Sequence, residues 1–374
     1  MKKLLYTILI ILLCLASFML VSCDGEENIT TTVDNEDNTT TTIIDKLCGH
    51  EKTVIISGKE PTTTSTGLTE GKKCILCGTI LKSQDIIPAI PVTDGFEYQL
   101  NNDNASYSVI GIGNYESTDL LIPSEYNGLP VTSVWEDSFL NCDKLTSVII
   151  SNGIVTIGKS AFEGCTNLVS VNIPSSVNFI GSSAFMHCES LLNITIPNGV
   201  CTIENYTFSF CESLTDIVIP DSIKEIGFSA FRNCKSLTNI SFGNGVVSIK
   251  MCAFAECHGI KEIILPDSVT ELGRQVFYSC DGLESFATGK GLTAIPNGMV
   301  SQCKNLKRVT IGENVSNIVI YAFLGCTSLD TITFNDTQGW KHGETPLDFT
   351  DSSKNPIYFK NVEYPYVFEK QAKP

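Results

Sequence analysis

The chain has 374 residues, of which 43% are hydrophobic and 18% are charged. This apolar content is ample for a folded core, while small polar residues must cover much of the surface. The formal net charge of −16 comes without a basic stripe, so nucleic acid and anionic bilayers are excluded as expected partners. The acidity is equally compatible with a role in solubility alone.

Residues 1–22 have the pattern of a lipoprotein signal peptide. Lys2 and Lys3 precede an apolar run that extends to Leu20, as in an export signal. The run ends in Leu20-Val21-Ser22-Cys23, which resembles a bacterial lipobox. This resemblance implies cleavage behind Ser22, a diacylglycerol group on Cys23, and a membrane-anchored protein at the bacterial cell surface. An ordinary secretory signal and a transmembrane helix are the alternatives, with Cys23 incidental.

Residues 23–45 are expected to form a lipid-anchored, disordered tether. Thr, Asn, Asp and Glu dominate the segment, and too few large apolar side chains are present to offset the entropy of ordering it. A flexible segment of this length spans roughly 25 Å on average. We therefore expect it to hold the following domains away from the membrane surface.

Residues 46–92 contain a small module with two groups of metal-ligand residues. Cys48-Gly49-His50 and Cys74-Ile75-Leu76-Cys77 supply four soft ligands, and a Cys-x-x-Cys turn lets two thiolates reach one tetrahedral ion. This pattern predicts a structural zinc site of Cys48, His50, Cys74 and Cys77, similar to a zinc ribbon. The alternative is a disulfide between Cys74 and Cys77, or between Cys48 and either of them, in an exported module too small to fold without a staple.

A cysteine recurs every 23 residues along more than half of the chain. A phenylalanine precedes most of these cysteines by three positions, and a leucine or isoleucine follows each by three. Val300 is the exception in the phenylalanine column. The cysteines are Cys142, Cys165, Cys188, Cys211, Cys234, Cys257, Cys280, Cys303 and Cys326.

A fixed period of this length predicts a solenoid, in which each short unit is buried only against its neighbours. Within one unit, residues 168–173 alternate as a strand does, and Pro174 ends the strand because proline cannot donate to a ladder. We therefore predict a parallel β-sheet on one face. The return limb is predicted to be irregular or a single helical turn, with Gly181 at a turn.

The unit Ile157-Gly158-Lys159-Ser160-Ala161-Phe162-Glu163-Gly164-Cys165-Thr166-Asn167-Leu168-Val169-Ser170-Val171-Asn172-Ile173-Pro174 resembles the BspA-like, treponemal-type leucine-rich repeat. The resemblance extends over residues 96–340, with an atypical opening repeat at 96–135. It implies a leucine-rich repeat solenoid in a surface protein that attaches to host matrix proteins, host cells or other microbes. Residues 341–374, rich in aromatic side chains, are expected to cap the last coil.

The cysteine ladder is predicted to be a packing feature. Stacked cysteines lie within disulfide range in distance, but their Cβ vectors run parallel along the stack, and nine thiols cannot pair completely. We expect buried thiols in a tight interior column. Cys201 and Cys252 lie outside the period and are expected to be structural or free.

The outward strand positions are the candidate binding face. They form a polar, shallow surface suited to an extracellular protein or glycan. The residues are Ser147, Ser170, Asn172, Asn193, Thr195, Asp216, Asn239, Ser241, Glu262, Arg308 and Thr310.

No catalytic motif is present in the sequence. A Gly-x-Ser-x-Gly elbow, a His-Glu-x-x-His pair and a phosphate-binding glycine loop are all absent. We therefore predict no enzymatic activity, no catalytic cofactor, and an adhesin-like binding lipoprotein. The alternatives are a self-associating envelope component without a foreign ligand and, more remotely, an enzyme accessory protein.

Overall fold

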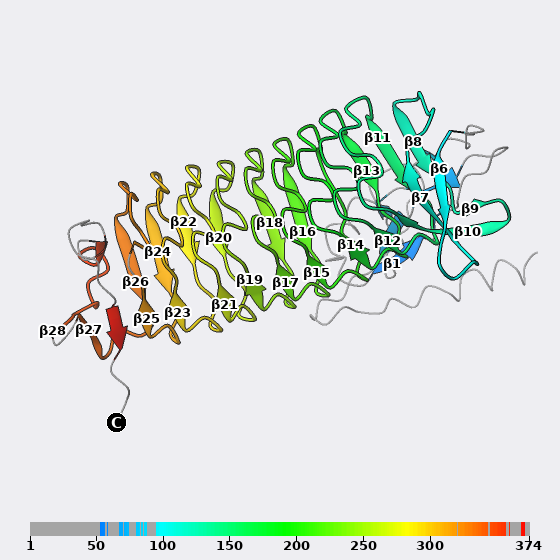
Figure 1. The fold of residues 1–374 in the computed structure, drawn as a ribbon. Coiled ribbons are helices and arrows are strands. Elements are labelled where there is room, and N and C mark those ends of the chain that lie inside the picture. The colour runs from blue at the N-terminus through cyan, green and yellow to red at the C-terminus, as the bar shows by residue number, and fades with distance from the viewer. Residues whose placement is uncertain are drawn as a thin grey trace, which may run out of the picture. The chain divides into compact units, whose positions relative to one another are not determined.

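The computed structural model describes residues 53–56, 58, 67–69, 71–74, 80–82, 84, 86–87, 95–319, 321–342, 345–356, 359 and 368–370. The chain divides into two compact units, residues 1–92 and residues 93–374. Within residues 95–319 every regular element is a strand (Figure 1).

The first unit contains two small antiparallel sheets. β3 (Gly71–Cys74) lies between β1 (Thr53–Ile56) and β4 (Ile80–Lys82), and β2 (Gly67–Leu68) pairs with β5 (Ile86–Ile87). Gly71 is buried at the start of β3, where an added Cβ would lie 2.8 Å from the Gln84 side chain. Glycine is thus needed for the close approach of these strands.

The second unit begins with two hairpins that start the solenoid. β6 (Glu97–Leu100) pairs with β7 (Tyr107–Gly111), and β9 (Glu125–Tyr126) pairs with β10 (Leu129–Val134), both antiparallel. Asn127 and Gly128 join β9 to β10 with positive φ angles, as a tight two-residue hairpin turn requires. β10 then pairs in parallel with β7, so the parallel stack begins inside this opening repeat.

The first row consists of parallel strands, most of which come shortly after the leucine or isoleucine of their repeat in the chain. Figure 1 shows this row. Partner residues are 23 positions apart, as in the pair Asp216 and Asn239, so the predicted parallel sheet on one face is confirmed. In residues 193–196 the row is reduced to a single bridge between Ser170 and Asn193. The strands are β8 (Asp119–Ile122), β11 (Ser147–Ile150), β13 (Ser170–Asn172), β16 (Asp216–Ile219), β18 (Asn239–Phe242), β20 (Glu262–Ile264), β22 (Ser285–Ala287), β24 (Arg308–Ile311) and β26 (Thr331–Phe334).

A second row of parallel strands lies on the return limbs (Figure 1). Of the two alternatives predicted for these limbs, the helical one is wrong, because short strands and turns occupy them. Gly181 follows β14 without a positive φ, and an added Cβ would lie 2.5 Å from the Lys159 backbone nitrogen, so it permits close coil contact. The strands are β12 (Thr156–Ile157), β14 (Phe179–Ile180), β15 (Thr202–Ile203), β17 (Glu225–Ile226), β19 (Ser248–Ile249), β21 (Glu271–Leu272), β23 (Ala294–Ile295) and β25 (Asn317–Ile318).

A third ladder of backbone hydrogen bonds runs through the turns beside the cysteines, and it joins every pair of successive coils from Phe139 to Ala322. The phenylalanine N–H of each coil donates to a carbonyl oxygen of the next, as from Phe139 to Ala161 at 2.8 Å and from Phe208 to Ala230 at 2.8 Å. Val300 keeps the bond to Ala322 at 3.1 Å although its side chain differs. This ladder is continuous where both strand rows are interrupted.

The turn ladder depends on two left-handed residues in each coil. They lie two positions before and two positions after the phenylalanine, with φ between 50° and 78°. The residues are Asp137, Asn141, Ser160, Gly164, Ser183, His187, Tyr206, Phe210, Ser229, Asn233, Cys252, Glu256, Gln275, Ser279, Gly298, Gln302, Tyr321 and Gly325. Most of them are not glycine, so the backbone of these turns is strained.

A stack of phenylalanine rings fills the interior beside the turns. Phe162 and Phe185 stack at 5.4 Å between centroids and 3°, and Phe231 and Phe254 stack at 5.1 Å and 2°. These side chains are completely buried. Such offset stacks add to the free energy gained by burying the rings, and from Phe139 to Phe277 the stack links each coil to the next.

The C-terminal segment covers the end of the second row. β29 (Phe368–Lys370) pairs antiparallel with β25 and with β27 (Trp340–His342), which also pairs with β28 (Thr345–Pro346). The Lys370 ammonium group lies 3.2 Å from the Asp336 carboxylate and 5.2 Å from the Trp340 ring centroid. These contacts close the edge that the last coil would otherwise leave open.

Candidate functional site

The predicted face residues all lie on the outward side of the first row. Side chains along a strand point alternately to the two sides of a sheet, and β16 shows this alternation as exposed Asp216 and Val218 against buried Ile217 and Ile219. The other predicted positions are exposed or half-buried: Ser147, Ser170, Asn172, Asn193, Thr195, Asn239, Ser241, Glu262, Arg308 and Thr310. The repeat thus presents them as one surface.

Several polar side chains of this face donate hydrogen bonds to the preceding coil. Ser147 donates a hydrogen bond to Asp119 at 2.6 Å, and Ser285 donates to Glu262 at 2.8 Å. Asn239 donates to the Asp216 carboxylate. These bonds link successive coils and reduce the hydrogen-bonding capacity that remains for a ligand.

Two acidic residues of the face have lowered pKa values. The Thr215 hydroxyl and then the Asn239 amide donate to Asp216, and both bonds lower the pKa of that carboxyl group. The hydrogen bond from Lys307, at 2.8 Å, lowers the pKa of the Glu284 carboxyl group. Both carboxylates are therefore charged at neutral pH and already have donors within the protein.

Charge is distributed unevenly along the face. The outward positions of the coils between residues 146 and 195 carry no charged side chain. From Asp216 onward the face contains acids and bases, among them Lys261, Glu262, Lys307 and Arg308. A ligand would therefore meet a neutral part between Asp119 and Asp216, called the neutral half below, and a longer charged part after it.

Apolar side chains also lie on the outward face. Val218 and Ile264 are each 66% exposed, while Val169 is 39% and Leu192 46% exposed. Isolated exposed side chains of this kind are common, but Val169 and Leu192 lie on adjacent coils of the neutral half. The neutral half thus combines apolar and polar side chains.

The predicted metal site lies mainly outside the described residues. Cys48, His50 and Cys77 are not among them, whereas Cys74 ends β3 with its side chain buried. In the described ranges no group of three or more His, Cys, Asp and Glu side chains could hold a metal ion. Cys23 and the tether lie outside the described residues too.

The repeat cysteines point into the core and donate hydrogen bonds. Each thiol from Cys165 to Cys326 donates to the carbonyl oxygen 26 residues earlier, at 3.1 to 3.2 Å. For Cys211 the acceptor is Phe185. Most of these thiols are thus second donors to carbonyl oxygens that already accept the backbone N–H of the cysteine in their own coil, as Phe162 does from Cys165.

Burial makes these thiols poor nucleophiles. It raises the pKa of the Cys165 thiol to about 12 and raises the pKa of Cys188 and Cys234 well above the ordinary range. By contrast Cys201, outside the period, has an exposed thiol.

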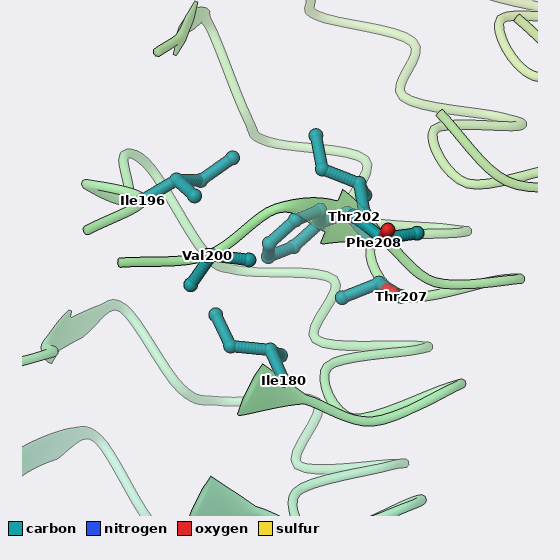
Figure 2. Close-up of a pocket in the computed structure, with 7 residues that line it drawn as sticks. Ile180, Ile196, Val200, Thr202, Thr207 and Phe208 are labelled. Carbon is teal, nitrogen blue, oxygen red and sulfur yellow. The ribbon is translucent and has the colours of Figure 1, made fainter. Parts of the chain in front are cut away.

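The coil of residues 188–210 interrupts both strand rows. β14 and β15 are not paired, and β13 is not joined to β16 through a full strand. A narrow apolar crevice lies at this point (Figure 2). Its walls are Ile180, Ile196, Val200, Thr202, Ile203, Thr207 and Phe208. The crevice is a packing defect without room for a ligand, so the open face remains the candidate site.

Two features of the solenoid were not predicted from the sequence. The hydrogen-bond partner of Ser147, Asp119, belongs to the opening repeat, whose length differs from that of the regular units. The left-handed turn positions were also missed, although Asn141, Gly164, Asn233, Gly298 and Gly325 are residue types that adopt this conformation readily. Reading these columns for Asn and Gly could have identified them.

A search for membrane-spanning helices among the described residues found none that is both long and apolar enough.

Comparison with protein families gives a match over most of the solenoid. The BspA type leucine rich repeat region matches in six copies, over residues 132–244 and 224–339, which together exceed half of the chain. A search of curated proteins gave no match.

Solved structures of bacterial repeat proteins are similar to this chain. A leucine rich cell surface protein from Faecalibacterium prausnitzii A2-165 is 21% identical, with 67% of this chain and 96% of that chain covered at a TM-score of 0.42. A leucine-rich repeat protein from Bacteroides ovatus ATCC 8483 is 28% identical, with 65% and 76% covered at 0.41. The pneumococcal vaccine antigen PcpA is 20% identical, with 65% and 69% covered at 0.40.

Proposed function

Because this chain belongs to the family of BspA-type leucine-rich repeat proteins, we propose that it is an adhesin-like cell-surface protein that binds extracellular protein or glycan partners. The observation that carries this proposal is the outward face of the first strand row. Its side chains occupy equivalent positions in successive coils and form one solvent-accessible surface. Extended surfaces of this kind are what repeat proteins use to hold large partners.

The mechanism is polyvalent contact along the solenoid. Each coil contributes a few weak polar and apolar contacts, and successive coils repeat them along the row. The partner's affinity then depends on the number of coils engaged, since many contacts that are individually weak act together. No step of this mechanism requires a catalytic residue or a cofactor.

The test is binding of the full chain to an array of extracellular-matrix proteins, mucins and glycans. A strand-face variant replaces Asn172, Thr195, Ser241 and Thr310 with alanine. Saturable binding that this variant loses supports the proposal. Binding that the variant retains in full would place recognition elsewhere on the molecule.

We also propose that the chain is exported and anchored by lipid on Cys23. The support is the signal pattern of residues 1–22 with Cys23 at its end. Acyl chains hold a protein at a membrane, because each buried methylene group contributes about 0.8 kcal/mol. The protein should partition into detergent, and Cys23→Ala should move it to the aqueous phase. Aqueous partitioning of the unaltered protein would contradict lipidation.

A second candidate function is self-association as a structural component of the envelope. Exposed apolar side chains on the return limbs favour it: Phe179 is 45%, Val247 is 41% and Met251 is 40% exposed. A second copy could cover these side chains. The test is the mass measured by sedimentation equilibrium, which should rise with concentration and become constant in Phe179→Ser. A constant mass for the unaltered chain would exclude this function.

A further inference from the structure

Four outward polar side chains form a patch that the protein leaves without internal hydrogen bonds. Ser170 and Asn172 lie on β13, while Asn193 and Thr195 lie on the next coil, and a bridge joins Ser170 to Asn193. All four are exposed. Across residues 95–319, no side-chain hydrogen bond of the protein involves any of them.

Other coils of the face differ from this patch. Ser147 is bonded to Asp119, Asn239 to Asp216, and Ser285 to Glu262. In those coils the outward donors and acceptors are used to join one coil to the next. The patch is therefore a group of four adjacent outward polar side chains, all neutral, whose hydrogen-bonding capacity is available to a ligand.

The patch is neutral in a strongly acidic chain. Asp, Glu, Lys and Arg are absent from the outward positions between residues 146 and 195, whereas the whole chain has a net charge of −16. An anionic ligand would meet no cation here and would be repelled by the rest of the protein. A cationic ligand would find its acids elsewhere on the face.

We propose that Ser170, Asn172, Asn193 and Thr195, with Val169 and Leu192 beside them, form a binding site for a neutral glycan. This inference rests on the proposed binding function and names its ligand class. Amide and hydroxyl groups both donate and accept hydrogen bonds, as sugar hydroxyl groups do. Val169 and Leu192, 39% and 46% exposed, offer an apolar surface to the C–H face of a sugar ring.

The geometry of the coils also favours an oligosaccharide. Neighbouring parallel strands are about 4.8 Å apart, a spacing comparable with that between successive sugar rings in an extended chain. The amides of Asn172 and Asn193 come from adjacent coils, so each can meet a different ring of one oligosaccharide. An extended neutral glycan can thus lie across the strands.

A protein partner fits the patch less well. Protein interfaces obtain most of their affinity from buried aromatic and arginine side chains, and none is present among these six residues. Specific protein complexes also bury about 800 Å² on each partner, which exceeds what six side chains of this size provide.

The experiment measures binding of the full chain to immobilised neutral gluco-, galacto- and manno-oligosaccharides and to sialylated and sulfated counterparts. Asn172→Ala combined with Asn193→Ala should weaken binding of the neutral glycan about tenfold or more, since two hydrogen-bonding groups are lost. Asn172→Asp should weaken it as well, through an unfavourable charge.

The matched control is the double variant Asn178→Ala with Asn198→Ala. These two exposed amides lie outside the strand face in the same two coils, so the control should bind the neutral glycan normally. The thermal midpoint of each variant verifies folding.

The outcomes separate this inference from the proposed function. Neutral glycans bound by the unaltered chain and the control, and lost by the patch variants, support the site. Unchanged binding in the double patch variant, or preference for charged glycans, overturns it. If the patch variants lose a protein partner and no glycan is bound, the glycan site is wrong while the binding function stands. If neither array is bound, both are wrong.

Discussion

Left-handed backbone at non-glycine residues is the feature of single residues that most affects this solenoid. Tyr206, Phe210, Gln275 and Tyr321 have φ between 55° and 61°. Non-glycine residues in this conformation cost roughly 1–2 kcal/mol each. The turn ladder of hydrogen bonds holds the backbone in place despite this cost.

Replacing Gln275 should separate backbone strain from side-chain contacts. Gln275→Val should destabilise the protein by about 1–2 kcal/mol relative to Gln275→Gly, because a β-branched residue resists the left-handed conformation. Chemical denaturation measures the difference. At Thr270, whose φ is not positive, the order should reverse, with valine the more stable variant. Equal stability of the Gln275→Gly and Gln275→Val proteins would show that the turn is not strained.

The thiols should differ sharply in reactivity. Cys201 is exposed and should react with iodoacetamide in the folded protein, while the core thiols should react only after unfolding. Since burial raises the pKa of Cys165 to about 12, raising the pH from 7 to 9 leaves that thiol protonated and unreactive. Peptide mass spectrometry of the labelled full chain measures the extent of labelling at each cysteine. Labelling of Cys165 at the rate of Cys201 would contradict a buried column.

At the scale of the element, the coil of residues 188–210 is the weakest link between strands. Both rows are interrupted there, yet the turn ladder and the phenylalanine stack continue. Phe208 stacks on Phe185 at 5.7 Å and on Phe231 at 5.2 Å, and it also lines the crevice. We infer that the phenylalanine stack holds the two halves of the solenoid together at this coil.

Phe208→Ala should therefore lower the free energy of unfolding by about 3–5 kcal/mol, through lost burial and an enlarged cavity. Urea denaturation gives the value. The control, Phe179→Ala, removes a ring that is 45% exposed and should cost much less. Similar losses in the two variants would mean that the stack does not join the coils.

Much of each coil could be predicted from the sequence, because core positions depend on residue type and spacing. The burial of Leu168, Phe162 and Ile173 follows from the period alone. The interruption at residues 193–196 could not be predicted, since Ile194, Ile196 and Pro197 keep the regular pattern there. The gap between β21 and β23 did have a signal, because Pro296 has no N–H to donate.

The candidate site, too, could be predicted from the sequence only in part. The exposure of Asn172 and Thr195 could be predicted from strand alternation. The side-chain pairing between coils was not predicted, although the sequence carries its signal. The Ser285 side chain donates to Glu262 of the preceding coil, whereas the coil before Ser170 has Ser147 at that position in place of an acid.

At the scale of the whole molecule, the zinc prediction concerns the unit before the solenoid. If Cys48, His50, Cys74 and Cys77 hold one Zn²⁺, the full chain should contain one equivalent of zinc by mass spectrometry of metals, and Cys77→Ser should lose it. Chelation should change the circular dichroism of the module and leave the solenoid folded. A chain without zinc, with Cys74 and Cys77 joined by a disulfide, would support the alternative.

Partner recognition by the outward face of the first strand row is the central proposal. Its most direct test compares two variants for binding to the same array. In the first, Asn172, Thr195, Ser241 and Thr310 are replaced with alanine. In the second, four exposed residues of the return limbs, Asn178, Lys224, Thr270 and Thr293, are replaced with alanine. We predict that the first variant loses saturable binding and the second retains it. Loss in the second with retention in the first would contradict the account.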